Sequence, residues 1–230
     1  MPSASGGARG SVPPDLESDF AAFRRAVQPW LTSVRGASAD GELVESLKKF
    51  GLLVHERAAS LSLIAQGDRP VLFTRHILDS LNLATITEAP PASLLDVGSG
   101  AGFPGIPLAI LWPETRVTLL ESRDRKAGFL ELAVRHLGLR HVRVVCDRLE
   151  RVSQDRSIDP VGAVTVRAVG DLPRLLTLAA PLATADAWWA YFVGGGLAED
   201  DARTLAPEAR VETGAFGGRI LRGSFRRSDS

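Results

Sequence analysis

The stretch LLDVGSGAGFPGIP (residues 94–107) combines residue types that bring a backbone close to a ligand. A short apolar run ends at Asp96, and Gly98, Gly100 and Gly102 come after it at alternate positions. Glycine lacks the Cβ atom that would hold a ligand away from the main chain, so a strand that ends in a glycine-rich turn is typical of a binding site. The sequence therefore predicts a small molecule held against the first turn of an α/β unit.

The spacing of these glycines separates two classes of cofactor. A dinucleotide fingerprint, G-x-G-x-x-G, has its third glycine five residues after the first, where the pyrophosphate meets a helix. Here the first glycine is Gly98, and the fifth position after it is Phe103, followed by Pro104. An aromatic ring and a proline would obstruct a pyrophosphate, whereas a cofactor without phosphate needs only close backbone contact and an apolar wall. The turn therefore favours S-adenosylmethionine over a dinucleotide.

An acidic residue ends the next apolar run. Glu121 closes VTLLE (residues 117–121), 23 positions after Gly98. A carboxylate at this place can accept hydrogen bonds from both hydroxyls of a ribose, which both cofactor classes contain. The alternative is an exposed glutamate that pairs with Arg123 or Lys126.

The segment after the fourth apolar run narrows the chemistry of the methyl acceptor. Enzymes that methylate an exocyclic amine carry an Asn/Asp-Pro-Pro-aromatic tetrapeptide there, but this chain has VTVRAVG (residues 164–170). Methylation of a pyrimidine carbon needs a cysteine nucleophile, and we interpret Cys146 instead as a buried structural thiol. The remaining acceptors are a purine ring nitrogen such as N7 of guanine, or an alcohol or carboxylate of a smaller molecule.

Arg167 stands at the end of that fourth run. Its guanidinium group could orient the substrate or stabilise the cofactor carboxylate. If it touches a guanine, it should address O6 or a phosphate, because a donor on the acceptor nitrogen would block the reaction. The alternative is an ion pair with Asp171 or Glu150.

The charge of the chain is balanced but unevenly distributed. Its 230 residues include 27 basic and 27 acidic side chains, which argues against a nonspecific nucleic-acid coat. Between Arg116 and Arg151 there are nine Lys/Arg and five Asp/Glu, and between Gly217 and Ser230 there are four Arg and one Asp. Each segment could supply a basic patch or be a solvated helix face.

Composition also sets expectations about location and metals. A single cysteine excludes an internal disulfide, and four scattered histidines do not have the spacing of a metal site. We expect no metal. The sequence contains neither an apolar run long enough to span a bilayer nor the apolar centre of a secretory signal, so we expect a cytoplasmic protein without membrane contact.

Periodicity divides the chain into three parts. Residues 1–14 are rich in Gly, Ser and Pro and are expected to be a disordered tail, while residues 15–89 have helical spacing and predict a helical cap. From residue 90 to residue 230, apolar runs alternate with helices, which indicates an α/β domain with a mostly parallel sheet. We expect seven strands, at residues 94–97, 117–120, 142–145, 163–166, 187–193, 210–216 and 218–225.

Two helices of this domain have clear ends. Residues 124–137 place apolar side chains on one face, and Gly138 comes next as a C-terminal stop. Asp171 precedes a second apolar segment and can cap its first turn.

Several motifs together resemble one family. FTRHILDSL, LLDVGSGAGFPGIPLAI, LLESRDRKAGFL, RLE and VRAV occur in the order and spacing of the bacterial ribosomal RNA small subunit methyltransferase G family, over about residues 71–182. The resemblance implies a Rossmann-like class I S-adenosylmethionine-dependent methyltransferase fold. It also implies transfer of a methyl group to N7 of a guanine in small-subunit (16S) ribosomal RNA, either as naked RNA or within the 30S particle. We expect a monomer.

The resemblance also assigns roles to individual residues. It implies that Arg167 is the family's functional arginine, with a catalytic role and a contact to the cofactor. Contacts to the cofactor are expected for Asp96, Gly98, Gly100, Gly102, Phe103, Glu121, Leu149 and Glu150, the last two through their backbone at the adenine. Contacts to the substrate are expected for Arg75, His76 and Arg123.

Two departures from the family pattern concern the substrate. Members usually have a lysine after the fifth strand, where this chain reads YFVGGG (residues 191–196), and an Asn-Leu-Thr before the Arg-His helix, where this chain reads SLSLIAQGD (residues 60–68). The missing lysine removes a cation that could hold an RNA phosphate. Two alternatives therefore remain open: a diverged paralogue that methylates a small metabolite, and a non-catalytic S-adenosylmethionine-binding factor of the ribosome.

Overall fold

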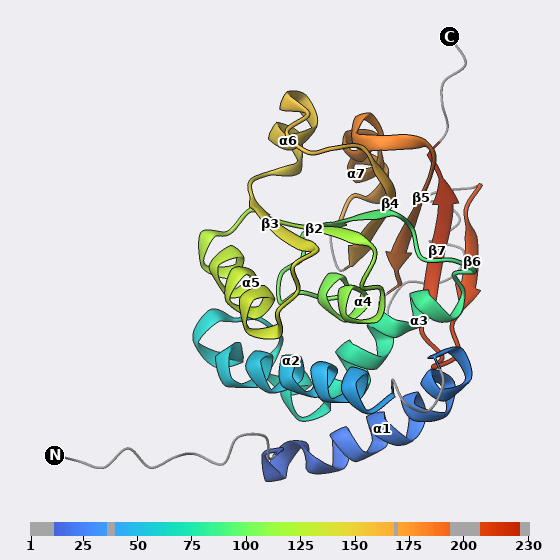
Figure 1. The fold of residues 1–230 in the computed structure, drawn as a ribbon. Helices are drawn as coiled ribbons and strands as arrows, with labels where there is room; N and C mark the ends of the chain where they lie inside the picture. The colour runs from blue at the N-terminus through green and yellow to red at the C-terminus, as the bar shows by residue number, and fades with distance from the viewer. Residues whose placement is uncertain (1–11, 36–39, 168–169, 194–207, 226–230) are drawn as a thin grey trace, which may run out of the picture.

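A computed structural model of the chain describes residues 12–35, 40–167, 170–193 and 208–225 (Figure 1). Its centre is a seven-stranded sheet with the order β3-β2-β1-β4-β5-β7-β6. The strands are β1 (Ser93–Val97), β2 (Arg116–Glu121), β3 (Val142–Cys146), β4 (Val161–Arg167), β5 (Ala183–Phe192), β6 (Arg210–Thr213) and β7 (Arg219–Ser224). All seven predicted strands are confirmed.

The first five strands are parallel, whereas β7 is antiparallel to β5 and to β6. In β1 every side chain is buried, as expected for a central parallel strand that is covered on both faces. The order reverses beside β1, where the chain returns from β3 to β4 on the other side. In open parallel sheets, ligands bind at the carboxyl ends of the strands next to such a reversal.

Helices cover both faces of the sheet (Figure 1). One face packs against α4 (Gly105–Leu111) and α5 (Asp124–Leu137), and the other against α6 (Leu149–Asp155), α7 (Leu172–Ala179) and the short turn η3 (Ala180–Leu182). The predicted stop of α5 is confirmed, because Gly138 has a φ of 68° and its N–H donates to the carbonyls of Val134 and Arg135. The predicted cap of α7 is confirmed as well, since Asp171 accepts a hydrogen bond from the N–H of Arg174.

The predicted helical cap consists of α1 (Pro14–Arg35), α2 (Asp40–Leu61), the 3₁₀ turn η1 (Gln66–Val71), the π-helical turn η2 (Phe73–Leu78) and α3 (Asp79–Thr85). Figure 1 shows α1 and α2 side by side under α4 and α5. The ring of Phe50 packs edge-on against that of Phe103 at 5.3 Å, so the cap shares one apolar core with the sheet. The prediction for residues 1–14 falls almost wholly outside the described residues.

A buried carboxylate joins α1 to the π-helical turn. Asp19 accepts hydrogen bonds from the N–H of Phe73 at 2.6 Å and from the N–H of Thr74 at 3.2 Å. These are backbone donors at the start of η2, which a helix leaves without partners of its own. Asp19 therefore fixes the beginning of the segment that carries Arg75 and His76. None of the helices in the described part of the chain has the length and apolar character needed to cross a membrane.

Candidate functional site

The glycine turn lies between β1 and α4, at the carboxyl ends of the parallel strands. Gly98, Gly100 and Gly102 have φ angles of 70°, 55° and 95°, in the left-handed region that favours glycine. The N–H groups of Gly98 and Ser99 donate to the carbonyl of Leu120 at 2.8 and 3.0 Å, which holds the turn against β2. The backbone of Gly98 and Gly100 faces an open pocket, as the sequence predicts.

Asp96 lies behind the turn rather than in the pocket. Its carboxylate is fully buried, accepting hydrogen bonds from the Thr165 hydroxyl at 2.8 Å and the Gly105 N–H at 3.3 Å. Burial raises the pKa of Asp96 to about 6. The side chain of Asp96 therefore holds the turn through Gly105 and Thr165, and its contact with the cofactor stays a prediction.

Two glycines serve close packing. A Cβ on Gly105, which the sequence analysis did not single out, would stand 2.7 Å from an Asp96 carboxylate oxygen. A Cβ on Gly102 would stand 2.6 Å from Ile106 and 3.2 Å from Phe50. Gly102 was expected at the cofactor, but the structure places it against the cap, outside the pocket lining.

Glu121 connects the turn to the start of α5. One carboxylate oxygen accepts from the Gly100 N–H at 2.9 Å, and the other accepts from the Arg123 N–H at 2.9 Å. The alternative of an exposed glutamate paired with a basic side chain is wrong, because Glu121 is buried and its partners are backbone groups. Each oxygen keeps a second lone pair, and Glu121 lines the pocket, where it can still accept from a ribose.

The pocket beside the turn has a volume of about 410 Å³. Seven of the predicted site residues line it: His76, Gly98, Gly100, Phe103, Glu121, Arg123 and Arg167. Six lining residues were missed by the sequence analysis: Leu63, Ile64, Ser99, Ala101, Ser122 and Lys126. Leu63 and Ile64 come from the connection between α2 and η1, and no local pattern signals that this connection reaches the turn.

Arg167 extends from the end of β4 to the cap. Its Nη2 atom lies 3.0 Å from Oδ2 of Asp79, and its two terminal nitrogens donate to the carbonyls of Arg75 and His76 at 3.2 and 3.4 Å. A further contact reaches the Ser80 hydroxyl at 3.4 Å. The guanidinium fork thus binds the π-helical turn η2 and the first turn of α3.

The alternative partners considered for Arg167 have other roles. Asp171 caps α7, and Glu150 forms an ion pair with Arg174 at 2.9 Å. The alternative of an ion pair between Arg167 and either of these acids is therefore wrong. The true partner, Asp79, is far from Arg167 in the sequence.

His76 lies between Arg167 and the glycine turn. Its ring stacks on that of Phe103 at 5.2 Å with an interplanar angle of 20°. Nε2 lies 3.2 Å from the Asp68 carboxylate, and Nδ1 lies 3.3 Å from Nη2 of Arg167. Burial, together with the charge of Arg167, lowers the pKa of His76 to about 4. The ring is therefore neutral at pH 7, with Nδ1 accepting from Arg167 and Nε2 donating to Asp68.

Three further predicted residues lie outside the pocket lining. Leu149 is buried at the start of α6, and Glu150 is exposed beside it. Arg75 is exposed and forms an ion pair with Asp68 at 2.8 Å. The backbone contact of Leu149 and Glu150 with an adenine stays a prediction.

The interpretation of Cys146 as a buried thiol is wrong. Cys146 is exposed, and its Sγ atom lies 3.1 Å from a carboxylate oxygen of Asp124. That hydrogen bond raises the pKa of the thiol, so Cys146 is not activated as a nucleophile. Cys146 is the last residue of the edge strand β3, which is consistent with its exposure.

The two departures from the family pattern can be located only in part. Val193 directly follows β5, but Gly194 and the rest of the segment without lysine lie outside the described residues. In the segment without asparagine, Ser62 has a φ of 48°. Asparagine and glycine adopt this left-handed conformation more readily than serine does.

Comparison with known proteins decides the family. The sequence model of the family described as rRNA small subunit methyltransferase G matches residues 43–213. The chain belongs to this family. A methyltransferase G of Roseiflexus sp. is 36% identical over 187 residues, covering 81% of this chain and 78% of its own length. A methyltransferase G of Nitrosomonas europaea is 35% identical over 185 residues, covering 79% and 84%.

Solved structures support the fold. The cofactor-bound protein Rv0187 from MTB aligns with a TM-score of 0.57 at 19% identity, covering 95% of this chain and all of that chain. A methyltransferase from Geobacter sulfurreducens aligns with a TM-score of 0.53 at 15% identity, covering 79% and 88%. The methyltransferase G chain therefore has the predicted Rossmann-like methyltransferase fold. Within the described residues, no group of three or more His, Cys, Asp or Glu side chains could hold a metal ion.

Proposed function

We propose that this protein transfers a methyl group from S-adenosylmethionine to N7 of a guanine in small-subunit (16S) ribosomal RNA. Its membership of the methyltransferase G family supports the reaction class and the RNA, and the pocket at the glycine turn supports the cofactor. S-adenosylmethionine supplies an electrophilic methyl carbon on a sulfonium centre. The protein's own residues must hold the two reactants in line and keep water out.

The residues of the pocket fit a nucleoside without a diphosphate. The open backbone at Gly98 and Gly100 allows close approach, and the free lone pairs of Glu121 can accept from two ribose hydroxyls. Phe103, Leu63 and Ile64 provide apolar surface. The ring of Phe103 stands where a dinucleotide fingerprint requires a glycine and a phosphate.

The single observation that favours a ring nitrogen as acceptor is the engagement of both pocket groups that could remove a proton. His76 has one nitrogen on Asp68 and the other on Arg167, while Glu121 binds two backbone N–H groups. N7 of guanine already carries a free lone pair and loses no proton when it is methylated. The pocket therefore matches an acceptor that needs no general base.

Arg167 then acts by position and charge. Its guanidinium group is bound to the cap through Asp79 and four other acceptors, and it lines the pocket beside His76. We infer that Arg167 holds the stacked rings of His76 and Phe103 in position, and these rings form one wall of the pocket. Arg123 and Lys126 line the same pocket from the start of α5, where they can contact RNA phosphates. Arg75 is exposed on η2, where it pairs with Asp68 and offers a further cation.

An RNA substrate within the ribosome implies action in the cytoplasm, and we propose that the protein acts there as a monomer. The balanced charge of the chain and the lysine missing after β5 are the observations that favour methylation of a small metabolite instead. A non-catalytic factor would bind S-adenosylmethionine without transferring its methyl group.

The experiment is to map N7-methylguanosine in ribosomal RNA from a strain that lacks the gene. The proposal predicts that one N7-methylguanosine disappears from the small-subunit RNA and returns when the gene is restored. An unchanged pattern of modification would refute it. Restoration with an Arg167→Ala variant that is present at normal level should leave the RNA unmodified.

A further inference from the structure

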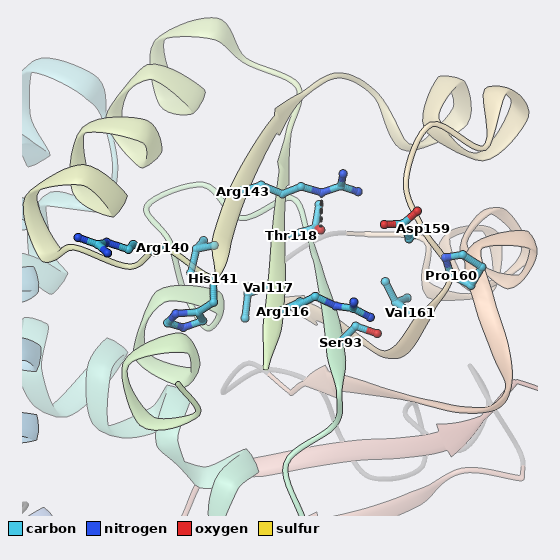
Figure 2. A pocket seen from close by; sticks show the side chains of 11 residues that line it. Ser93, Arg116, Val117, Thr118, Arg140, His141, Arg143, Asp159, Pro160 and Val161 are labelled. Carbon is cyan, nitrogen blue, oxygen red and sulfur yellow. Dashed lines mark hydrogen bonds between the residues drawn. The ribbon is translucent and has the colours of Figure 1, made fainter. Parts of the chain in front are cut away.

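A second hollow lies at the opposite edge of the sheet, at the amino ends of the strands. It has a volume of about 260 Å³, and its polar side chains include Ser93, Arg116, Thr118, Arg143 and Asp159. Figure 2 shows that Arg116 and Arg143 extend from β2 and β3 toward the same side, where Asp159 lies. The side chain of Arg140 lines the same edge but points the other way.

The register of the strands produces this arrangement. Arg116 and Thr118 are two residues apart on β2 and share a face of the sheet, and Thr118 pairs with Arg143 of β3. Farther along the same face, Leu120 is packed under Leu149 and Val152 of α6. Because α6 has only seven residues, it does not extend over the arginines. The sheet is left open here with basic instead of apolar side chains.

The structure fixes one of the two arginines of the hollow and, among the residues it describes, pairs neither of them with an acid. Nε of Arg143 donates to the Thr118 hydroxyl at 3.0 Å, which leaves its terminal nitrogens available. Within the described part of the chain, neither Arg116 nor Arg143 forms an ion pair. The Ser93 hydroxyl oxygen accepts from the Gly162 N–H at 3.1 Å, so its proton can still be donated. Two guanidinium groups and two hydroxyls thus converge on one concave surface.

This set of donors matches the oxygens of a phosphate, which guanidinium groups bind in a bidentate manner. We propose that the hollow binds a phosphodiester of the substrate RNA, as a second contact remote from the methyl-transfer pocket. This inference rests on the proposed function, because the RNA partner is the substrate named in that proposal. Arg116 and Arg143 belong to the basic segment between Arg116 and Arg151, so the proposal names two cations of that segment that contact RNA.

The distance between the two sites suits an extended RNA. The hollow and the pocket are separated by the length of β2, six residues or roughly 20 Å at about 3.3 Å per residue. About six stacked nucleotides span this length at roughly 3.4 Å each. The chain has no net charge to draw RNA to it, and it lacks the lysine that members of the family usually have after the fifth strand. Unpaired arginines at a second contact would compensate for that loss.

The test measures direct binding of a fluorescently labelled fragment of small-subunit ribosomal RNA to the full-length protein, by anisotropy at several KCl concentrations. An Arg116→Ala/Arg143→Ala variant should bind at least about tenfold more weakly at low salt. The slope of log K against log salt should become shallower by about 1.4, two contacts at roughly 0.7 each for single strands. The matched control is Arg25→Ala/Arg135→Ala, which removes the same charge from exposed side chains outside the hollow and should bind within about twofold of wild type.

A variant that should strengthen RNA binding keeps the test independent of folding, because misfolding would weaken binding. Asp159→Asn removes the acid that lies beside the two arginines and should strengthen RNA binding severalfold. Equal losses in the two double variants, or an Asp159→Asn affinity equal to that of wild type, would overturn the proposal. Thermal unfolding and S-adenosylmethionine affinity should match wild type in all three variants, because none of these residues lines the cofactor pocket.

The same proteins separate this inference from the proposed function. If the wild type binds RNA through the hollow but forms no N7-methylguanosine, the proposed function fails and the contact stands. If N7-methylguanosine forms with the same KM for RNA in Arg116→Ala/Arg143→Ala as in the control, the contact fails and the proposed function stands.

Discussion

Arg167 at the end of β4 and Asp79 at the start of α3 form an ion pair, with 3.0 Å between Nη2 and Oδ2. The pair joins the central sheet to the helical cap directly beside the cofactor pocket. Burial raises the pKa of Asp79, and the charge of Arg167 acts in the opposite direction. Through this contact, the cap becomes a wall of the site.

The several hydrogen-bond donors of the Arg167 guanidinium group should affect activity more than its charge does. A lysine keeps the charge but cannot reach Asp79, the Arg75 carbonyl and His76 Nδ1 together. We expect Arg167→Lys to lower kcat by about 10- to 100-fold through misplacement of the pocket wall. Steady-state kinetics with RNA substrate would measure this.

The control for that change is Arg174→Lys, in an exposed arginine of α7 that pairs with Glu150. It should leave kcat within about twofold of wild type, because exposed ion pairs contribute little. Equal activity of Arg167→Lys and Arg174→Lys would contradict the role given to Arg167.

Substitution of two glycines with similar backbone angles distinguishes an effect on cofactor binding from an effect on stability. Gly100 has a φ of 55° and lines the pocket, whereas Gly138 has a φ of 68° and ends α5 with open space around it. An alanine at either position should cost about 1 kcal/mol of stability because of its strained backbone. Calorimetry should show S-adenosylmethionine affinity at least about tenfold weaker in Gly100→Ala and unchanged in Gly138→Ala. Normal affinity in Gly100→Ala would place the cofactor elsewhere.

Ser62 offers a stabilising substitution. Its φ of 48° is unfavourable for serine, and asparagine or glycine adopts this conformation at lower cost. Ser62→Asn should raise the free energy of unfolding by about 0.5–1 kcal/mol, measured by urea denaturation. Arg156, with a φ of 46° at the end of α6, should respond in the same direction to Arg156→Gly. A lower stability of Ser62→Asn would show that the serine hydroxyl has a contact that outweighs the strain.

His76 should make the fold sensitive to acid. Its pKa is about 4 in the folded protein and near 6.5 in the unfolded chain, so between these values only the unfolded chain takes up the proton. The stability that depends on neutral His76 is complete above pH 6.5 and is lost as the pH falls toward 4.

A His76→Gln variant cannot titrate at this position and should lack that part of the pH dependence. The difference in slope should be on the order of 1 kcal/mol per pH unit between pH 4.5 and 6. Asp96 titrates in the same range with the opposite sign, but it is present in both proteins. A His76 ring that titrates near pH 6.5 by NMR would contradict the hydrogen bonds assigned to it.

The sequence was sufficient for the sheet and for the glycine turn because both are encoded locally. The strands of four to ten residues lie between turn residues, and the spacing from Gly98 to Phe103 favours S-adenosylmethionine over a dinucleotide. The stop at Gly138 and the cap at Asp171 depend only on neighbouring backbone groups, which is why they were predicted correctly.

The features that the sequence did not reveal depend on contacts between distant segments. The only partners that the sequence offered for Arg167 were the nearby acids of the alternative interpretation, but Arg167 binds the π-helical turn η2 about 90 residues away. The sequence did not reveal that the Asp96 carboxylate is buried behind the turn, because this depends on its packing against Gly105 and Thr165. Cys146 was interpreted as a buried structural thiol, but it ends β3, the last strand of the sheet, and is exposed.

The most direct measurement of the central claim is transfer of a labelled methyl group by the purified protein. S-adenosylmethionine with a tritiated methyl group is incubated with small-subunit particles, and separately with naked small-subunit RNA, from a strain that lacks the gene. The account predicts that label enters the RNA of at least one of these substrates and is recovered as N7-methylguanine. Tight binding of S-adenosylmethionine with no label in either RNA, or label recovered only in small metabolites, would contradict it.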